Sequence, residues 1–535
     1  MPTRRRRHGC REGVGCRAIG APRDAAPQRS TGGTHIRGRG PARGLLAAAV
    51  LVLSLAFAST ASADSFVVLY KGNAVPASAK TDVQKAGGTF VYGYDQIGVA
   101  IARSDSAAFA SKLAKDNRIE GVSSTAGFAS QLRNDDAGGA QGTLPNAPAA
   151  DSDPFSSMQW DMRQIHTPQA HAITGGSPSV LVGDIDTGLD FHHPDLAPNV
   201  SDADSANCVS GAPVPGAAAA NDDNGHGTHT AGTIAAASNG VGIVGVAPNV
   251  KIAGIKAGNA DGFFFPQAVI CAFMWAGNRH VDVTNNSYFA DPWEYNCRND
   301  PEQRAIWNAE RRAIKFAQGQ GVTVVAAAGN DSDDLSHPTT DKTSPDDTTP
   351  VTREITNACA VVPVEVPGVV GVSATGSTNQ DGSAGQYADN LKSYYSSFGV
   401  SAVDVAAPGG DRRFFTPESV NGRVLSTWPA SIPCLVPGPT PAYCWAQGTS
   451  MASPHATGVA ALIVSRLGHV PPGRVAARLS QTADPQQCPN SLPTTPSDYL
   501  SITGVNSGAV QQCQGGPGHN SWYGSGQIDA LSAIG

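Results

Sequence analysis

The sequence is short of charged residues, which make up 15% of its 535 positions. Glycine and proline are plentiful instead, with 60 and 38 copies. This balance argues against coiled coils and helical bundles, and it indicates many tight turns and long surface loops. A chain of this length exceeds one typical domain, so we expect one large core domain with accessory segments.

Long hydrophobic runs are missing as well. The apolar stretch "LLAAAVLVLSLAFA" at 45–58 is shorter than the roughly 20 residues that span a bilayer. It follows an arginine-rich leader and precedes "ASA" at 61–63, which is typical of an export signal. We therefore expect residues 1–63 to be a signal peptide cleaved after Ala63, and the protein to be secreted without a stable membrane anchor.

Positive charge is scarce once the leader is set aside. Residues 64–535 hold 26 basic and 42 acidic side chains, a formal charge of −16. Nucleic-acid binding relies on Lys and Arg that neutralise phosphates. The composition therefore argues against a nucleic acid as partner.

No CxxC pair occurs, which argues against a zinc site. An even number of cysteines beyond the leader of an exported chain favours disulfides, although eight cysteines allow 105 pairings. Short loops suggest Cys434 with Cys444 and Cys488 with Cys513. The remaining four are left open: Cys208, Cys271, Cys297 and Cys359.

The chain divides into two parts by its hydrophobic pattern. Residues 66–124 read as strand, helix, strand, strand, helix, strand, and 134–153 is an aperiodic segment rich in Gly, Ala, Pro and Asp. We expect a small domain over 64–133, a cleavable linker over 134–153 and a catalytic domain over 154–535. In the last, apolar strands alternate with helices, which indicates an α/β fold whose parallel sheet is covered on both faces. Function in such sheets gathers at the carboxyl ends of the strands.

Two motifs lie early in this domain, and the first of them ends an apolar strand. "DIDTG" puts Asp184 and Asp186 on one side of a strand with only Asp186 at the turn, although an ordinary turn fits as well. "NGHGTHTAG" surrounds His226 and His229 with small residues. Glycines beside His226 would let a substrate backbone approach, which favours a catalytic base there. His229 is better explained as a hydrogen-bonded core histidine.

Two further motifs carry polar groups that can stabilise an anion. "VTVVAAAGND" ends a strand at Asn330, whose amide is either a turn former or a donor to developing negative charge. "GTSMASPH" places Ser450 where a helix begins. A helix N-cap is the plain explanation, but the backbone N–H groups and the dipole of a helix start also stabilise an oxyanion beside a nucleophile.

Taken in order, "DIDTGLDFHHPDL", "NGHGTHTAGTIAA", "AAAGND" and "GTSMASPHATGVAAL" resemble the subtilisin-like serine proteases, the subtilases. "VTNNSYF", "SSFG", "VDVAAPG" and "WYGSGQIDAL" match as well, and the resemblance covers roughly 154–535. It implies a subtilisin-like parallel sheet with helices on both faces, preceded by a small ferredoxin-like α+β propeptide domain.

The resemblance also assigns roles. Asp186 would orient His226, His226 would act as general base and acid, Ser450 as nucleophile, and Asn330 as oxyanion donor. Ala328 and Gly329 would bind substrate together with a strand that reads Ser287-Tyr288-Phe289. The family usually has Ser-Leu-Gly on that strand, so the subsites are expected to differ.

The family's partners and cofactors carry over in the same way. We expect polypeptide substrates, the protein's own propeptide as inhibitor with self-processing within 134–153, and a monomer. No cofactor is needed for the chemistry. The acidic inserts 291–304 and 331–358 leave room for a structural calcium ion, although such loops are often merely solvated.

Two rival functions remain. A catalytically inactive subtilase-fold binding protein would leave Ser450 unlabelled by an organophosphonate. A metal-dependent hydrolase using His192, His193, His226 and His229 would lose activity with a chelator. Within "GTSMASPH" we expect Thr449 to shape the helix approach, Ser453 to pack or bond within the helix, and Pro454 to fall in its first turn.

Overall fold

The computed structural model describes residues 63–125, 152–290, 292–346, 348–376, 391–413, 422–489 and 502–535. The predicted signal peptide, apart from Ala63, lies outside the described residues, and so does most of the predicted linker. Within the described ranges no helix combines the length and the apolarity that crossing a membrane requires.

The N-terminal unit is a four-stranded antiparallel sheet with two helices. Its strands are β1 (Asp64–Tyr70), β2 (Thr89–Tyr94), β3 (Val99–Ser104) and β4 (Ile119–Ser124), in the order β2-β3-β1-β4. Helices α1 (Ala79–Ala86) and α2 (Phe109–Leu113) complete the βαββαβ pattern that the sequence predicts. Because side chains alternate along a strand, Phe66 and Val68 join Phe109 in the unit's own core. Val67 and Leu69 join the core of the large domain.

The large domain is built on an eight-stranded sheet in the order β16-β15-β11-β9-β5-β8-β6-β7. All neighbours in it pair in parallel except β6 and β7. The strands are β5 (Leu181–Asp186), β6 (Ala206–Asn207), β7 (Val214–Pro215), β8 (Lys251–Lys256), β9 (Val283–Asn286), β11 (Thr323–Ala327), β15 (Val370–Thr375) and β16 (Val405–Pro408).

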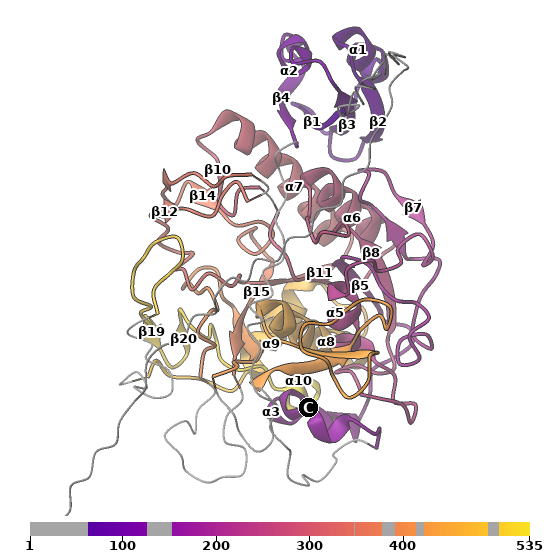
Figure 1. The fold of residues 1–535 in the computed structure, drawn as a ribbon, viewed down its shortest axis with the longest axis vertical. Coiled ribbons are helices and arrows are strands. Elements are labelled where there is room, and N and C mark those ends of the chain that lie inside the picture. Colours follow the sequence, from indigo (N-terminus) through magenta and orange to yellow (C-terminus); the bar gives the residue numbers. More distant parts are fainter. Residues whose placement is uncertain are drawn as a thin grey trace, which may run out of the picture. The chain divides into compact units, whose positions relative to one another are not determined.

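Helices cover both faces of this sheet, as predicted. On one face α6 (Pro266–Asn278) and α7 (Pro301–Gly319) pack side by side (Figure 1) and share a core with Ile185, Ile255 and Val324. On the other, Val182, Ile252 and Val325 pack with α5 (His226–Ala235), α8 (Thr449–Leu467), α9 (Pro472–Thr482) and α10 (Ala530–Ile534). The alternation of neighbouring residues between the two cores explains why these strands are apolar throughout.

Short elements complete the domain. They are the 3-10 turn η1 (Ser156–Met158), helices α3 (Trp160–Gln164) and α4 (Thr167–His171), and the two-stranded pairs β10 (Asn296–Cys297) with β14 (Cys359–Ala360), β12 (Thr340–Asp341) with β13 (Arg353–Glu354), β17 (Val424–Thr427) with β18 (Tyr443–Ala446), and β19 (Gly515–Gly516) with β20 (His519–Asn520).

The start of helix α7 at Pro301 is set by the residue that caps it. Asp300 caps it by accepting hydrogen bonds from the backbone N–H groups of Glu302 and Gln303, and Pro301 occupies the first turn, where no N–H partner is needed.

Four disulfides link the eight cysteines. Cys434–Cys444 and Cys488–Cys513 are the two pairs predicted from short loops. Cys208–Cys271 and Cys297–Cys359 close loops of 63 and 62 residues, which the sequence could not choose. The last bond ties β10 to β14.

Candidate active site

Strand ends and helix starts bring the predicted site residues to one edge of the large sheet. Asp186 is the last residue of β5, and Ser287 directly follows β9. Ala328, Gly329 and Asn330 follow β11. His226 begins α5 and Ser450 is in the first turn of α8, and these two helices pack against each other. This is the carboxyl edge that the parallel topology predicts.

Asp186 and His226 form a buried pair. Nδ1 of His226 lies 2.7 Å from Oδ1 of Asp186, and both residues are at most 1% exposed. The same oxygen accepts the backbone N–H of Thr187 at 2.7 Å. A carboxylate at Nδ1 fixes the tautomer in which Nε2 carries the lone pair. Nε2 is buried and has no hydrogen-bond partner among the described residues.

Asp222 holds this pair in place, and the sequence analysis missed it. One of its oxygens accepts from Thr187 Oγ1 at 3.0 Å and from the Gly225 N–H at 2.9 Å. The other accepts the N–H of Thr228 at 2.9 Å and its hydroxyl at 2.6 Å. A single carboxylate therefore joins the turn after Asp186 to the first turn of α5. The signal that could have identified Asp222 is an Asp shortly before a helix start flanked by glycines.

Asp184 lies behind the pair and is also buried. It accepts hydrogen bonds from Thr230 Oγ1 at 2.8 Å and Asn285 Nδ2 at 2.9 Å. Burial, followed by the charge of Asp186, raises the pKa of Asp184 well above its usual range. Asp184 is therefore held by Thr230 and Asn285, whereas Asp186 is the acid that faces His226.

The glycines beside His226 lie against other parts of the protein. A Cβ at Gly225 would lie 2.2 Å from the Trp428 ring, and one at Gly227 would lie 2.1 Å from the carbonyl oxygen of Gly188. Protein atoms occupy that space. Whether a substrate backbone approaches His226 past these glycines stays a prediction.

Ser450 is 6% exposed, and its hydroxyl donates to the carbonyl oxygen of Ser287 at 3.2 Å. Pro454 lies in the second turn of α8, not the first as predicted. Its missing N–H would have bonded the Ser450 carbonyl four residues earlier. The hydroxyl of Ser287 replaces that donor, at 3.0 Å from the Ser450 oxygen. The proline thus leaves the Ser450 carbonyl free to accept from Ser287, which directly follows β9.

Thr449 orients the amide of Asn330. Both the backbone N–H and the hydroxyl of Thr449 donate to Oδ1 of Asn330, at 2.9 and 3.0 Å. The Thr449 hydroxyl in turn accepts the Gly329 N–H at 3.1 Å. Because Oδ1 is held, the Nδ2 donors must point the other way. The predicted role of Thr449 in shaping the helix approach takes this specific form.

Ser453 bonds outside its helix, contrary to the prediction. Its hydroxyl donates to Oδ1 of Asn285 at 2.7 Å, while Nδ2 of Asn285 contacts Asp184 and, at 3.1 Å, Ser287 Oγ. A buried polar network therefore joins β5, β9 and α8 beneath the site. Because the polar groups of this network hydrogen-bond to one another, they hold these three elements together at the edge of the site.

One cavity beside Ser450 collects the predicted substrate-binding residues: Ser287, Tyr288, Phe289, Ala328, Gly329 and Asn330, together with Thr449. The ring of Tyr288 stacks on Phe264 with centroids 4.3 Å apart, and its hydroxyl donates to Asn286 Oδ1 at 3.1 Å. Tyr288 is therefore held in place where it lines the cavity. Phe289 is half-buried at the same cavity.

The four histidines of the metal-hydrolase alternative do not converge. Nε2 of His193 contacts the Ala442 carbonyl at 2.9 Å, and that of His229 contacts the Cys444 carbonyl at 3.1 Å. Burial lowers the pKa of His229 to about 3, so it is a neutral core histidine as expected. His226 is engaged with Asp186, and His192 is exposed. Their geometry favours no shared metal ion.

Two carboxylates of the acidic inserts have their hydrogen-bond partners within the protein. Asp333 accepts from the N–H groups of Asn506 and Ser507 at 2.9 and 3.0 Å and from the Ser507 hydroxyl at 2.7 Å. Asp341 is paired with Arg353. Calcium requires six to eight oxygen ligands, and Asp333 and Asp341 are committed to these other partners. A structural calcium ion elsewhere in the inserts stays a prediction.

In the described ranges, three metal-capable side chains cluster at His166, Asp484 and Asp529, outside those inserts. There the hydrogen bond from His166 to Asp529 raises the pKa of His166, and the group is explained as an ion pair.

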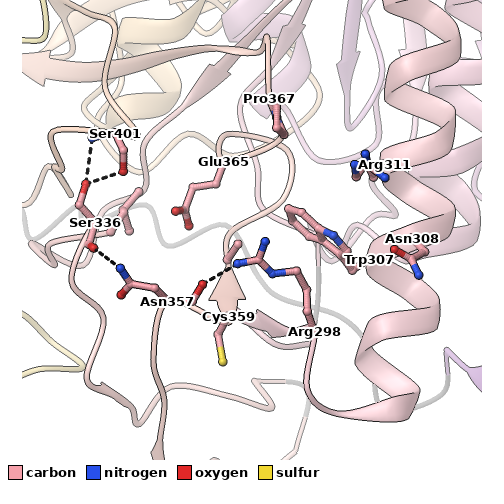
Figure 2. A pocket seen from close by; sticks show the side chains of 12 residues that line it. Arg298, Trp307, Asn308, Arg311, Ser336, Asn357, Cys359, Glu365, Pro367 and Ser401 are labelled. Atoms are coloured by element: carbon pink, nitrogen blue, oxygen red, sulfur yellow. Dashed lines mark hydrogen bonds between the residues drawn. The ribbon is translucent and has the colours of Figure 1, made fainter.

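The most spacious of the cavities described, about 570 Å³, shares no lining residue with the one at Ser450. Figure 2 shows Trp307 across from Ser336, with Glu365 between them. Arg298 donates to the carbonyl oxygen of Asn357 at 2.5 Å. Burial raises the pKa of Glu365 to about 7. Among its described lining residues, no hydroxyl forms a hydrogen bond with Glu365.

Known proteins match both the sequence and the fold. The Peptidase_S8 model of the subtilase family matches residues 177–526. Subtilisin BL of Lederbergia lenta is 32% identical over 310 residues, 57% of this chain and 84% of that protein. Subtilisin E of Bacillus subtilis (strain 168) is 30% identical over 327 residues, 61% of this chain and 66% of that protein.

Two solved structures are similar in fold. The epidermin leader peptide processing serine protease of Staphylococcus aureus has a TM-score of 0.60 at 23% identity, over 88% of this chain and 98% of that one. Fervidolysin from Fervidobacterium pennivorans, a keratinolytic enzyme related to subtilisin, has a TM-score of 0.58 at 22% identity, over 89% of this chain and 61% of that one.

The family model covers more than half of the chain, and the chain therefore belongs to the subtilase family. With its subtilisin relatives, this makes it a subtilisin-like serine endopeptidase. The resemblance and the predicted subtilisin-like α/β fold are confirmed. The propeptide role of the N-terminal unit stays a prediction.

Proposed function

We propose that the chain is a secreted endopeptidase in which Asp186, His226 and Ser450 act as a triad, and that it is made as a self-processed zymogen. The observation that carries the proposal is the 2.7 Å pair of Asp186 and His226, whose buried Nε2 has no hydrogen-bond partner among the described residues. This nitrogen is available to take a proton from a nucleophile. No comparable observation favours an inactive binding protein.

In the proposed reaction the Ser450 hydroxyl leaves the Ser287 carbonyl and turns to Nε2 of His226 when a substrate binds. Hydrogen bonds between nucleophile and base are often loose before a substrate is present. His226 takes the hydroxyl proton while Oγ attacks the peptide carbonyl, and then gives that proton to the leaving amine. The ester left on Ser450 is cleaved by water, with His226 again as base.

The negative charge on the carbonyl oxygen needs donors that do not reorganise during the reaction. We propose the Nδ2 of Asn330 and the backbone N–H of Ser450, at the start of α8, for this role. Thr449 fixes the amide of Asn330 through Oδ1, as described above. One chain supplies nucleophile, base and donors, so we propose a monomer that acts on polypeptides and needs no cofactor for the chemistry.

We propose that residues 64–133 are an inhibitory propeptide. The unit contacts α7 of the large domain through Arg312, which donates to the Tyr70 and Ile97 carbonyls and pairs with Glu120 at 2.8 Å. Ser123 donates to the Glu302 carbonyl at 2.9 Å. Val67 and Leu69 add apolar contacts, because their side chains belong to the core of the large domain. They are of the kind that a released inhibitor could give up.

Self-processing is tested with the full chain carrying Ser450→Ala. The wild-type chain should lose residues up to the linker, whereas the Ser450→Ala chain, purified alone, should stay intact. N-terminal sequencing of both products checks this. Cleavage of the Ser450→Ala chain at the wild-type position would disprove self-processing.

A further inference from the structure

The cavity beside Ser450 is acidic. Besides the strand residues named above, Glu294, Asp331 and Asp346 line it, and none of its described lining residues is Lys, Arg or His. Glu294 is 3% exposed and Asp331 is 6% exposed. Three acidic residues therefore line one cavity next to Ser450.

This cavity receives one particular part of a substrate. Asn330 and Ser450, the proposed oxyanion donors, form part of its wall. The carbonyl under attack must lie between them. The residue that contributes this carbonyl carries its side chain on the adjacent Cα atom. That side chain is therefore the group that enters the cavity.

The wall combines apolar and acidic groups. Phe289, Ala327, Ala328 and Val361 contribute carbon surface alongside the carboxyl groups. Lys and Arg bury an aliphatic stem and keep a charged head near polar partners, which this wall suits. A divalent ion, in contrast, requires an all-oxygen shell.

Glu294 has neutral hydrogen-bond partners, and Arg353 is committed to another carboxylate. Arg353 is engaged with Asp341 and also donates to the Tyr295 carbonyl at 2.8 Å. Glu294 accepts from Asn506 Nδ2 at 2.5 Å and from Thr343 Oγ1 at 3.1 Å, both neutral groups. Burial, followed by the charges of Asp331, Asp333 and Asp341, raises the pKa of Glu294 well above its usual range. A cation in the cavity would offset this repulsion.

We propose that Glu294 and Asp331 make the enzyme specific for a basic residue, Arg or Lys, on the acyl side of the bond that it cuts. The inference rests on the proposed function of Ser450. It names the substrate class of that same site.

The sequence holds an independent sign of this preference. Between the last residue of β4, Ser124, and the first residue of α3, Trp160, the only basic residue is Arg133. It directly precedes the predicted linker 134–153. A protease specific for basic residues would release residues 64–133 by cutting after Arg133.

The test compares peptides that differ only at the acyl-side residue. Enzyme obtained from the full chain is assayed on peptides with arginine or with citrulline, its neutral counterpart of similar shape. We expect kcat/KM for the arginine peptide to exceed that for the citrulline peptide on the order of 100-fold, because neutral citrulline cannot form the buried charge pair that arginine forms. Equal rates would overturn the specificity, whereas failure to cut any peptide would count against the proposed function itself.

Variants assign the preference to residues. Glu294→Gln and, separately, Asp331→Asn should each lower the arginine-to-citrulline ratio by about 10-fold or more. Glu354→Gln is the matched control, because Glu354 is exposed on β13 and does not line the cavity. It should leave the ratio unchanged. If either cavity variant fails to fold, the comparison of arginine and citrulline peptides with wild-type enzyme still tests the specificity.

Two further outcomes are decisive. In the full chain, Arg133→Gln should slow release of the N-terminal unit by about 10-fold or more, whereas release at the wild-type rate would overturn the proposal. Calcium chloride is titrated against wild type and Glu294→Gln by calorimetry. Calcium binding that requires Glu294, together with equal rates on arginine and citrulline peptides, would make the cavity an ion site and overturn the proposal.

Discussion

Glu310 should make the fold lose stability as the pH rises. It lies on the buried face of α7, is 0% exposed, and neither carboxyl oxygen has a hydrogen-bond partner among the described residues. Burial raises its pKa to about 8. The unfolded chain releases this proton near its ordinary pKa of about 4.3, but the folded chain keeps it until about 8.

The size of the effect follows from this difference. Folded protein binds more protons than unfolded protein across the window, so the free energy of unfolding falls with rising pH. At about 1.36 kcal/mol for each pH unit, the loss from about pH 4.3 to about pH 8 is on the order of 5 kcal/mol. The contribution is fully present below the window and lost above it. Glu310→Met, which conserves volume and removes the charge, should abolish that slope and stabilise the protein most in alkali.

Urea unfolding measures the effect, in a Ser450→Ala background that prevents self-digestion. The difference between Glu310→Met and its parent should grow from near zero at about pH 4 to several kcal/mol at about pH 8.5. Glu302→Gln, an exposed residue on the first turn of the same helix, is the control and should change neither value nor slope. A parent and a Glu310→Met variant with parallel pH profiles would refute the assignment.

Three further substitutions test how the site is held. Asn330→Ala should lower kcat by about 100- to 1000-fold with little change in KM, because the proposed donor serves the transition state alone; steady-state kinetics on one peptide check this. Thr449→Val should lower kcat by about 10-fold, since the Asn330 amide loses the hydroxyl that orients it, and Thr449→Ser should restore activity; equal kcat for the Val and Ser variants would contradict this role. Asp222→Ala should lower kcat by about 10-fold or more and lower the melting temperature, because the Asp186 turn and the start of α5 lose their common acceptor; unchanged kcat would show that other contacts hold the pair.

The sequence predicted what depends on local pattern and on topology. Apolar strands alternating with helices imply a two-sided parallel sheet, and such a sheet gathers its strand ends, which is why Asp186, Ser287 and Asn330 meet at one edge. Cysteines close in sequence could be paired from loop length alone. Those that close loops of about 60 residues depend on the tertiary fold.

What the sequence could not predict was set by neighbours distant along the chain. Gly227 is small because the Gly188 carbonyl lies against it, and Ser453 turns outward because Asn285 offers an acceptor there. Pro454 is tolerated in the second turn of its helix because Ser287 supplies the missing donor. The acidic lining of the cavity beside Ser450 could not be predicted either, since Glu294 and Asp331 come together there only in the folded chain.

Labelling with an organophosphonate tests the central claim most directly. The reagent, added to enzyme matured from the full chain, should attach to the Ser450 hydroxyl in a one-to-one ratio as peptidase activity disappears, and mass spectrometry of the fragment that contains "GTSMASPH" should locate it. Peptidase activity that survives the reagent, or is lost through attachment at a residue other than Ser450, would contradict the triad proposed here.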